Sequence, residues 1–254
     1  MNDLLEQIAA KKAELDRLRV QSLHALGNLE HVHDLELTYT SNAIEGNTLD
    51  AAETTLVIEQ GITIGGKPLK DHLEAIDHHE AIGYVRDLAR QATSLTEADV
   101  RTLHSLIVKR SAPDIAGRYA DRGRYALTDA GRHSFPSPAE VPALMGDFAA
   151  WLRSVPATPE TAFVAHRRLV DIHPFDDGNG RTARLLMNLV LIRGGYPPVA
   201  VRPADRPAYF RALQEAQAGR GADVFNRLLC ERLDATLGEY IAALQAIASA
   251  PKDG

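Results

Sequence analysis

Residues 173–184 read HPFDDGNGRTAR, and a mainly apolar run, residues 185–192, follows at once. Apolar side chains recur in that run at steps of three and four residues, which predicts a helix that a pair of glycines ends. A polar loop therefore leads into a helix N-terminus. Gly178 and Gly180 allow positive φ angles and close approach of a ligand. Because the free N–H groups of a first helical turn favour an anion, the stretch is typical of a phosphate-binding site.

The side chains of this stretch add further chemistry. Arg181 and Arg184 lie three residues apart and share a helix face, where guanidinium groups suit phosphate oxygens. Asp177 offers an oxygen ligand for Mg²⁺ bound to nucleotide phosphates, and His173 could take a proton from an attacking hydroxyl. In the alternative interpretation this is a polar loop between helices, where Asp177 caps the helix, the arginines are solvated and His173 packs. Phe175 is expected to be buried in both cases.

The stretch resembles the signature of Fic proteins, H-x-F-x-[D/E]-G-N-G-R-x-x-R, at every fixed position. Fic proteins mostly transfer AMP from ATP to a hydroxyl group of a target protein. The resemblance implies an all-α Fic fold with a small hairpin, and a protein adenylyltransferase that uses ATP and Mg²⁺. It implies His173, Asn179 and Arg181 as catalytic residues, with His173 as the general base, and Asp177 as the metal ligand. The nucleotide-binding residues it implies are Phe175, Gly178, Asn179, Gly180, Arg181, Arg184 and Tyr209.

A second motif lies near the N-terminus, where residues 41–46 read SNAIEG. Taken alone, the segment predicts a short helix that begins at Thr40 or Ser41 and ends in a turn at Gly46. It also resembles the pattern [S/T]-x-x-x-E-[G/N] of the inhibitory helix of Fic proteins. That resemblance implies an autoinhibitory helix at about residues 40–47, in which Ser41 and Glu45 are the inhibitory residues and Glu45 pairs with Arg184.

A β-hairpin is expected before the signature. Residues 124–135 could fold as two short strands that turn near residues 129–131, and a surface loop is the alternative. Gly117-Arg118-Tyr119 is loosely similar to the G-x-[F/Y]-R sequence that precedes the hairpin flap of Fic proteins. The resemblance implies that the flap, at about residues 117–136, aligns a target protein by strand pairing.

The remaining sequence predicts helices. One amphipathic helix is expected over residues 2–35, packed on its own domain or, alternatively, in a coiled-coil dimer. Residues 62–67 could be a short strand or an extended loop. Further helices are expected over residues 50–60, 68–91, 96–110, 137–154 and 158–172, and over 204–218 and 223–248 after the signature. The histidines at 72, 78 and 79 are interpreted as surface residues of a helix and not as metal ligands.

Two regions are expected: an N-terminal helical region, residues 1–95, and a catalytic core, residues 96–254. The chain departs from relatives after the signature, where they often carry Y-Y-x-x-L-x-x-A-N-x-G-D. Here Tyr209 and Phe210 are followed by Ala218 near the asparagine position. Specificity for adenine is therefore less firmly implied than the phosphate chemistry.

The composition limits the classes of molecule that the protein is expected to bind. The net charge of −6 argues against a general nucleic-acid binder, and the chain has one cysteine and no apolar run long enough to span a membrane. We therefore expect a cytoplasmic protein that binds ATP and a target protein, modifies itself, and could form a homodimer. The alternatives are a de-AMPylase, in which Glu45 positions a water molecule, and a toxin-like switch or non-catalytic interaction module.

Overall fold

The computed structural model describes residues 1–21, 23–91, 93–128 and 131–249. This part of the chain is mainly α-helical and has one small sheet, so the predicted all-α class with a hairpin is confirmed. The α-helices are α1 (Asn2–Gln21), α2 (Leu23–Ile44), α3 (Ala51–Gln60), α4 (Leu69–Arg90), α5 (Glu97–Ile107), α6 (Val141–Ser154), α7 (Pro159–Ile172), α8 (Asn179–Arg193), α9 (Arg206–Gln217) and α10 (Ala222–Ser249). Short 3₁₀ helices, η1 (Pro113–Ile115) and η2 (Pro203–Asp205), and the strands β1 (Tyr125–Thr128) and β2 (Gly131–Ser134) complete the described part.

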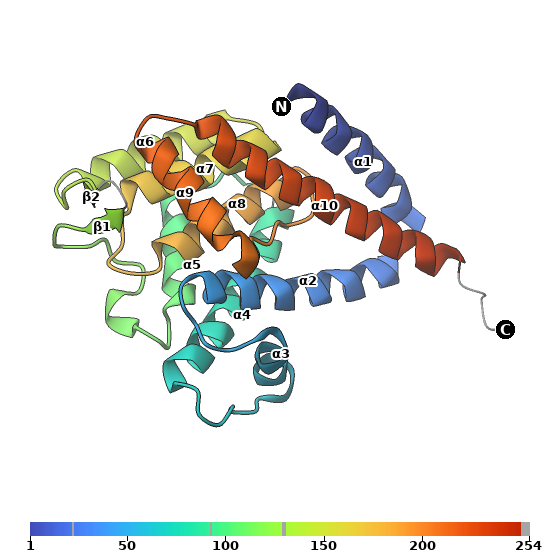
Figure 1. Cartoon of the computed structure of the whole chain (residues 1–254), viewed down its shortest axis with the longest axis horizontal. Coiled ribbons are helices and arrows are strands. Elements are labelled where there is room, and N and C mark those ends of the chain that lie inside the picture. Colours follow the sequence, from blue (N-terminus) through green and yellow to red (C-terminus); the bar gives the residue numbers. More distant parts are fainter. Residues whose placement is uncertain (22, 92, 129–130, 250–254) are drawn as a thin grey trace.

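Helix α8 is the centre of the core. It lies among the other helices (Figure 1) and contacts α4, α5 and α7. Its residues from Arg181 to Leu191 are buried, the polar Arg181, Arg184 and Asn188 included. Its buried side chains join one large apolar cluster that also contains Ile8, Val85 and Phe163. The cluster thus takes residues from both predicted regions, and the boundary near residue 95 stays a prediction.

The prediction of one helix over residues 2–35 is wrong. Helix α1 ends at Gln21, α2 begins at Leu23, and the two helices point in different directions (Figure 1). The reason is that they pack on different partners, α1 on α10 and α2 on α4, which one straight helix could not reach together. Ile8 and Leu15 of the expected amphipathic helix are buried, and Lys11 forms an ion pair of 2.8 Å with Asp234 of α10. Helix α1 therefore packs on its own chain.

The predicted short helix at residues 40–47 is the last part of α2, which starts much earlier. Polar residues are accommodated in this helix because the Thr38 and Thr40 hydroxyls donate to main-chain carbonyls one turn back. The helix ends where Gly46 has a φ of 98°. Asn42 and Asn47 then donate to the main-chain carbonyls of Glu74 and Asp71. These bonds attach the end of α2 to α4.

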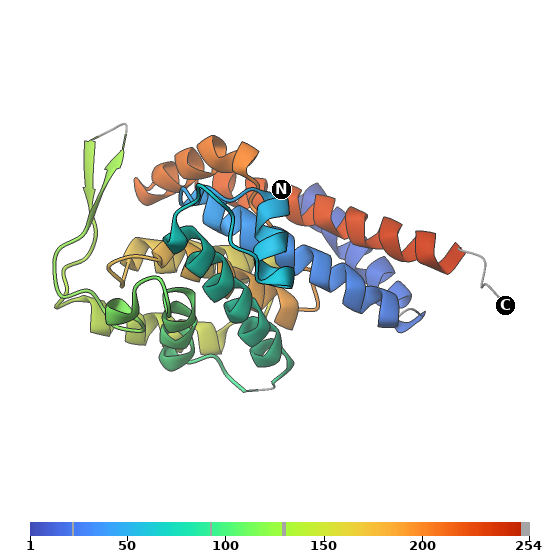
Figure 2. The same cartoon turned by 90° about the horizontal axis from the view of Figure 1, so that it is seen from below.

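The hairpin is present and stands out from the helical body (Figure 2). Its strands are antiparallel, with Tyr125 opposite Ser134 and Thr128 opposite Gly131. The predicted turn near residues 129–131 lies largely outside the described residues. Tyr125 and Leu127 are 55% and 79% exposed, so β1 presents apolar side chains to solvent.

Several local predictions are refined by the structure. Thr96 and Thr158, the first residues of two expected helices, are the N-caps of α5 and α7. Residues 62–67 form no strand but an extended segment and a turn. The Ser137 hydroxyl and N–H both donate to Glu140, but this closes a separate turn and α6 starts only at Val141.

Two of the three histidines of α4 are not surface residues. His72 and His78 are buried, because they lie on the side of α4 that faces the rest of the protein, and His72 Nε2 accepts a hydrogen bond from the Ile64 N–H at 2.8 Å. Within the described ranges, no three His, Cys, Asp or Glu residues are grouped as a metal site would require. In the same ranges, no helix has the length and apolar character needed to cross a membrane.

Candidate active site

The signature stretch forms the loop between α7 and α8. Among the described residues, His173 is the only non-glycine residue with a positive φ, 50°, and it ends α7. Gly178 has a φ of 76° and precedes α8, and a Cβ there would lie 2.9 Å from the Ile107 side chain. The predicted positive φ of Gly180 is wrong, since Gly180 is already helical. Its lack of a side chain matters for another reason: a Cβ would collide with the Glu45 carboxylate.

His173 is held as a neutral imidazole with one free nitrogen. Its Nδ1 lies 3.3 Å from the Val170 carbonyl oxygen, which can only accept, so Nδ1 carries the proton and Nε2 has a free lone pair. Burial lowers the pKa of His173 to about 4. Its ring stacks on Phe135, with ring centres 3.7 Å apart. Phe135 follows β2 directly, so the base of the hairpin fixes this imidazole.

Asn179 braces the loop. Its side-chain oxygen accepts from the Phe175 N–H at 3.0 Å, and its side-chain nitrogen donates to the Phe175 carbonyl at 2.7 Å. These two bonds fix the orientation of the Asn179 amide within the loop, and its predicted contact with a nucleotide stays a prediction. The Phe175 ring is buried, as predicted.

His104 was missed by sequence reasoning. Its ring stacks on Phe175 at 3.7 Å, its Nε2 donates to the Asp177 carbonyl at 3.0 Å, and its Nδ1 accepts from the Gly117 N–H at 3.0 Å. Burial lowers the pKa of His104 to about 4, so the ring stays neutral and serves both partners. The available signal was its spacing from Val100 and Ile107, which places it on the apolar face of α5.

Asp177 and Arg181 differ in exposure. The Asp177 side chain is 55% exposed, and its Oδ1 accepts from the Gly178 N–H at 2.7 Å. The Arg181 side chain is 3% exposed and pairs with Glu74 at 3.1 Å and with Asp177 at 3.5 Å. Arg181 is thus buried in an ion-pair network and does not extend outward from the loop. Asp177 can reach a ligand in solvent, and this single carboxylate suits a Mg²⁺ ion that takes its other ligands from phosphates and water.

Arg184 joins the two sequence motifs. Its Nε donates to the Ser41 hydroxyl at 3.0 Å, and its Nη2 donates to the Ser41 carbonyl at 2.9 Å and to Glu45 Oε1 at 2.7 Å. The guanidinium is 5% exposed, whereas the Glu45 side chain is 37% exposed. The end of α2 therefore occupies the arginine that a terminal phosphate would need.

Tyr209 is 1% exposed, and the charge of Arg184 acts on its hydroxyl. Its hydroxyl hydrogen-bonds His166 Nε2 at 2.7 Å. Direct contact of this ring with an adenosine would need its surroundings to open, so that role stays a prediction. A pocket of about 310 Å³ lies nearby between the hairpin and α9, lined by Thr128, Arg132, His133, Arg211, Gln217 and Arg220 among others.

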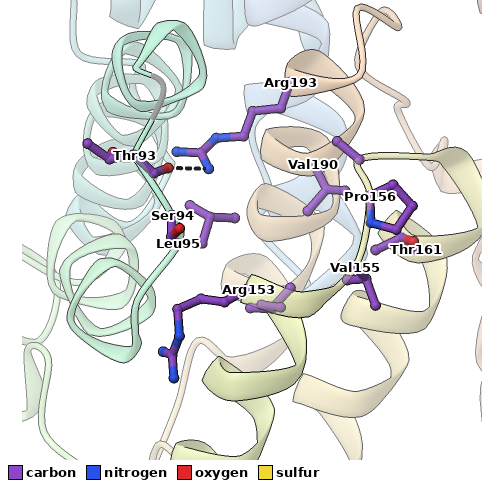
Figure 3. Close-up of a pocket in the computed structure, with 11 residues that line it drawn as sticks. Thr93, Ser94, Leu95, Arg153, Val155, Pro156, Thr161, Val190 and Arg193 are labelled. Atoms are coloured by element: carbon purple, nitrogen blue, oxygen red, sulfur yellow. Dashed lines mark hydrogen bonds between the residues drawn. The ribbon is translucent and has the colours of Figure 1, made fainter.

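Another pocket, of about 220 Å³, lies at the far end of α8 (Figure 3). Arg193 enters it and donates to the Thr93 carbonyl at 2.8 Å. With a helical rise of about 1.5 Å per residue, Arg193 is roughly 20 Å from the start of α8. No residue of either motif lines this pocket, which separates it from the candidate site.

The buried histidines predict a loss of stability in acid. Burial lowers the pKa of His166 to about 3, whereas an unfolded histidine titrates near 6.5. Between these values only the unfolded state takes up the proton, so stability is full above about pH 6.5 and falls below it, by roughly 2 kcal/mol per such histidine at pH 5. We expect His166 and His104 to lower Tm together between pH 7 and pH 5. In thermal unfolding, His31→Asn should keep this pH dependence and His166→Phe should weaken it; a constant Tm would contradict the assignment.

Comparison with known proteins places this site in a family. The Fic/DOC family description matches residues 94–191. A Fic-domain-containing signaling protein from Bacteroides thetaiotaomicron superposes with a TM-score of 0.86 and 30% identity, over 94% of this chain and 97% of that one. The chain belongs to the Fic/DOC family. Fic-1 from Caenorhabditis elegans superposes with a TM-score of 0.83 and 30% identity, over 95% of this chain and 71% of that one.

Curated relatives of this Fic/DOC chain carry the name protein adenylyltransferase. The protein adenylyltransferase Fic of Nematostella vectensis is 34% identical over 248 residues, which is 95% of this chain and 56% of the relative. The protein adenylyltransferase fic-1 of Caenorhabditis elegans is 32% identical, over 91% of this chain and 48% of the relative. The chain thus spans about half the length of the curated relatives it matches.

Proposed function

We propose that the protein is a protein adenylyltransferase, which transfers AMP from ATP to a Ser, Thr or Tyr hydroxyl of a target protein. The observation that carries the proposal is the free Nε2 of the neutral His173, held beside the N-terminus of α8. A neutral imidazole can accept a proton at pH 7, and the helix N-terminus can hold phosphates. The names of the curated relatives support the same activity.

The proposed step uses these residues as follows. His173 Nε2 takes the proton of the acceptor hydroxyl, whose oxygen forms a bond to the α-phosphorus of ATP. The bond between that phosphorus and the oxygen bridging to the β-phosphate breaks, and pyrophosphate leaves. The N–H groups at the start of α8 stabilise the charge on the phosphate oxygens. Asp177 would hold a divalent cation, which supplies charge neutralisation for the departing pyrophosphate.

We further propose that Glu45 inhibits this transfer. Arg184 can donate hydrogen bonds to the Glu45 carboxylate or to the γ-phosphate of ATP, but it cannot satisfy both groups at once. The de-AMPylase alternative rests on a different observation: the charge of Glu45 is near enough to act on the pKa of His173. A water molecule between the two side chains could then attack an AMP group on a modified target.

Target binding is assigned to the hairpin. The exposed Tyr125 and Leu127 of β1 support it, because a strand with solvent-facing apolar residues can pair with an extended segment of another protein. Self-AMPylation is expected, since a released active site would meet hydroxyls of its own chain. A homodimer and a cytoplasmic location stay predictions.

Two differently labelled ATP molecules test the activity. The protein should incorporate label from [α-³²P]ATP, and none from [γ-³²P]ATP, into itself or into a protein of the source cell's lysate. Incorporation of the γ-label would indicate a kinase. If neither the wild-type protein nor the Glu45→Gly protein incorporated either label, the non-catalytic interaction module would be the better interpretation.

Asp177→Ala should reduce transfer and its dependence on Mg²⁺ together. The change removes the exposed carboxylate at the loop, and Arg181 keeps its partner Glu74. We would titrate MgCl₂ in the labelling assay with both proteins and use Asp176→Ala as the matched control, since that neighbouring carboxylate pairs with Arg122. Full activity of the wild-type protein in EDTA would disprove the metal role of Asp177.

A further inference from the structure

Arg124 is a buried cation with unused donors. It precedes β1 directly and is 8% exposed. Its Nη2 donates to the Pro136 carbonyl, and its own carbonyl accepts from the Phe135 N–H at 3.1 Å. Its Nε and Nη1 are buried and have no hydrogen-bond partner in the part of the chain that the structure describes. Because unpaired charged donors are costly to bury, this side chain is suited to a partner that the protein alone does not supply.

The surroundings of Arg124 indicate where that partner binds. The two residues at the base of the hairpin, Arg124 and Phe135, are bonded to each other, and Phe135 stacks on His173. Burial is the main reason for the low pKa of His173, and the charge of Arg124 lowers it further. The nearest acidic candidate, Asp176, already pairs with Arg122 at 3.3 Å. The unpaired donors therefore belong to a residue that is joined to His173 through Phe135, and they have no carboxylate partner among the described residues.

We propose that Arg124 is a catalytic residue that binds the α-phosphate of the nucleotide during AMP transfer. The inference rests on the proposed function. An acceptor oxygen that gives its proton to His173 attacks the α-phosphorus, so the oxygens of this phosphate must lie next to His173. The N–H groups at the start of α8 are uncharged donors, and Arg184 is assigned to the γ-phosphate, so Arg124 would add a charged donor at the α-phosphate. The unpaired Nε and Nη1 are charged donors, which suit phosphate oxygens where charge builds up in the transition state.

Binding of AMP and of adenosine tests the contact without turnover. Arg124→Gln should weaken AMP binding at least tenfold and leave adenosine binding within twofold, as measured by calorimetry in the Glu45→Gly background. Arg122→Gln is the matched control. It removes an equal positive charge two residues before Arg124, and the Arg122 side chain is 77% exposed. It should change neither affinity. Equal AMP affinity of the Arg124→Gln and Arg122→Gln proteins would overturn the proposal.

Kinetics provide the second readout. Arg124→Gln should raise the KM for ATP by about the factor by which it weakens AMP binding, and should lower kcat by about a hundredfold to a thousandfold as well. Arg124→Lys keeps the charge but loses the Nε and Nη1 donors, so it should be intermediate, and it replaces Arg124→Gln if that protein does not fold. A defect confined to one target, with normal self-AMPylation, would instead assign Arg124 to target binding and overturn the proposal. Absence of AMP transfer by the parent protein itself would contradict the proposed function.

Discussion

Glu45→Gly should raise self-AMPylation roughly ten- to a hundredfold. The change removes the carboxylate that shares Arg184 Nη2 with the Ser41 carbonyl, and so frees the guanidinium for the γ-phosphate. A charge-assisted hydrogen bond contributes about 1.5–3 kcal/mol, and about 1.4 kcal/mol corresponds to a factor of ten in an equilibrium. The same change should abolish any removal of AMP, because that reaction would use the carboxylate to position water.

Three proteins measured side by side check this result: wild type, Glu45→Gly and Glu45→Gly/His173→Ala. Incorporation of [α-³²P]AMP into each chain is the readout. Glu45→Gln serves as the conservative control, since it keeps the shape and loses the charge, and it should show an intermediate gain. Equal labelling of the wild-type and Glu45→Gly proteins would exclude the inhibitory role of Glu45.

His173→Ala should abolish AMP transfer while ATP binding stays near normal. The imidazole is proposed to act on the acceptor, whereas the phosphates bind at the start of α8. Loss of a general base costs about a hundredfold to ten-thousandfold in rate. His173→Asn is the companion variant, because asparagine tolerates the positive φ of this position better than alanine does.

The control for His173 is His31→Ala, a change at an exposed histidine that pairs with Glu59. It should leave both transfer and ATP binding unchanged. If His173→Ala lost ATP affinity, the side chain would belong to the nucleotide site and not to the acceptor. Strong labelling by the Glu45→Gly/His173→Ala protein would rule out His173 as the base.

Local signals in the sequence were sufficient for much of the fold. Thr96 and Thr158 begin helices because their side chains accept from N–H groups three residues away, an interaction that needs only neighbouring residues. The limits of α1 and α2 could not be predicted in this way. They depend on packing against α10 and α4, which are distant in the sequence.

In the candidate site, too, the motifs could be predicted from the sequence, whereas contacts between distant residues could not. The contacts of Arg184 with Ser41 and Glu45 match the two motifs, although 139 residues separate Glu45 from Arg184. His104 and Phe135 escaped prediction because only the fold brings them to the signature loop. Gly180 was singled out for backbone freedom, but its contact with Glu45 could not be read from a single stretch.

The attachment of α2 to α4 has a consequence for how the proposed inhibition behaves in solution. Under the proposed function Glu45 would be a tethered competitor of the γ-phosphate, and the bonds of Asn42 and Asn47 to α4 hold it in place. Its effective concentration at Arg184 is set by the chain itself and not by the amount of protein. Dilution therefore leaves the inhibited fraction unchanged, and purification cannot remove the inhibitor. Only a rise in ATP concentration or a displacement of the end of α2 shifts the balance.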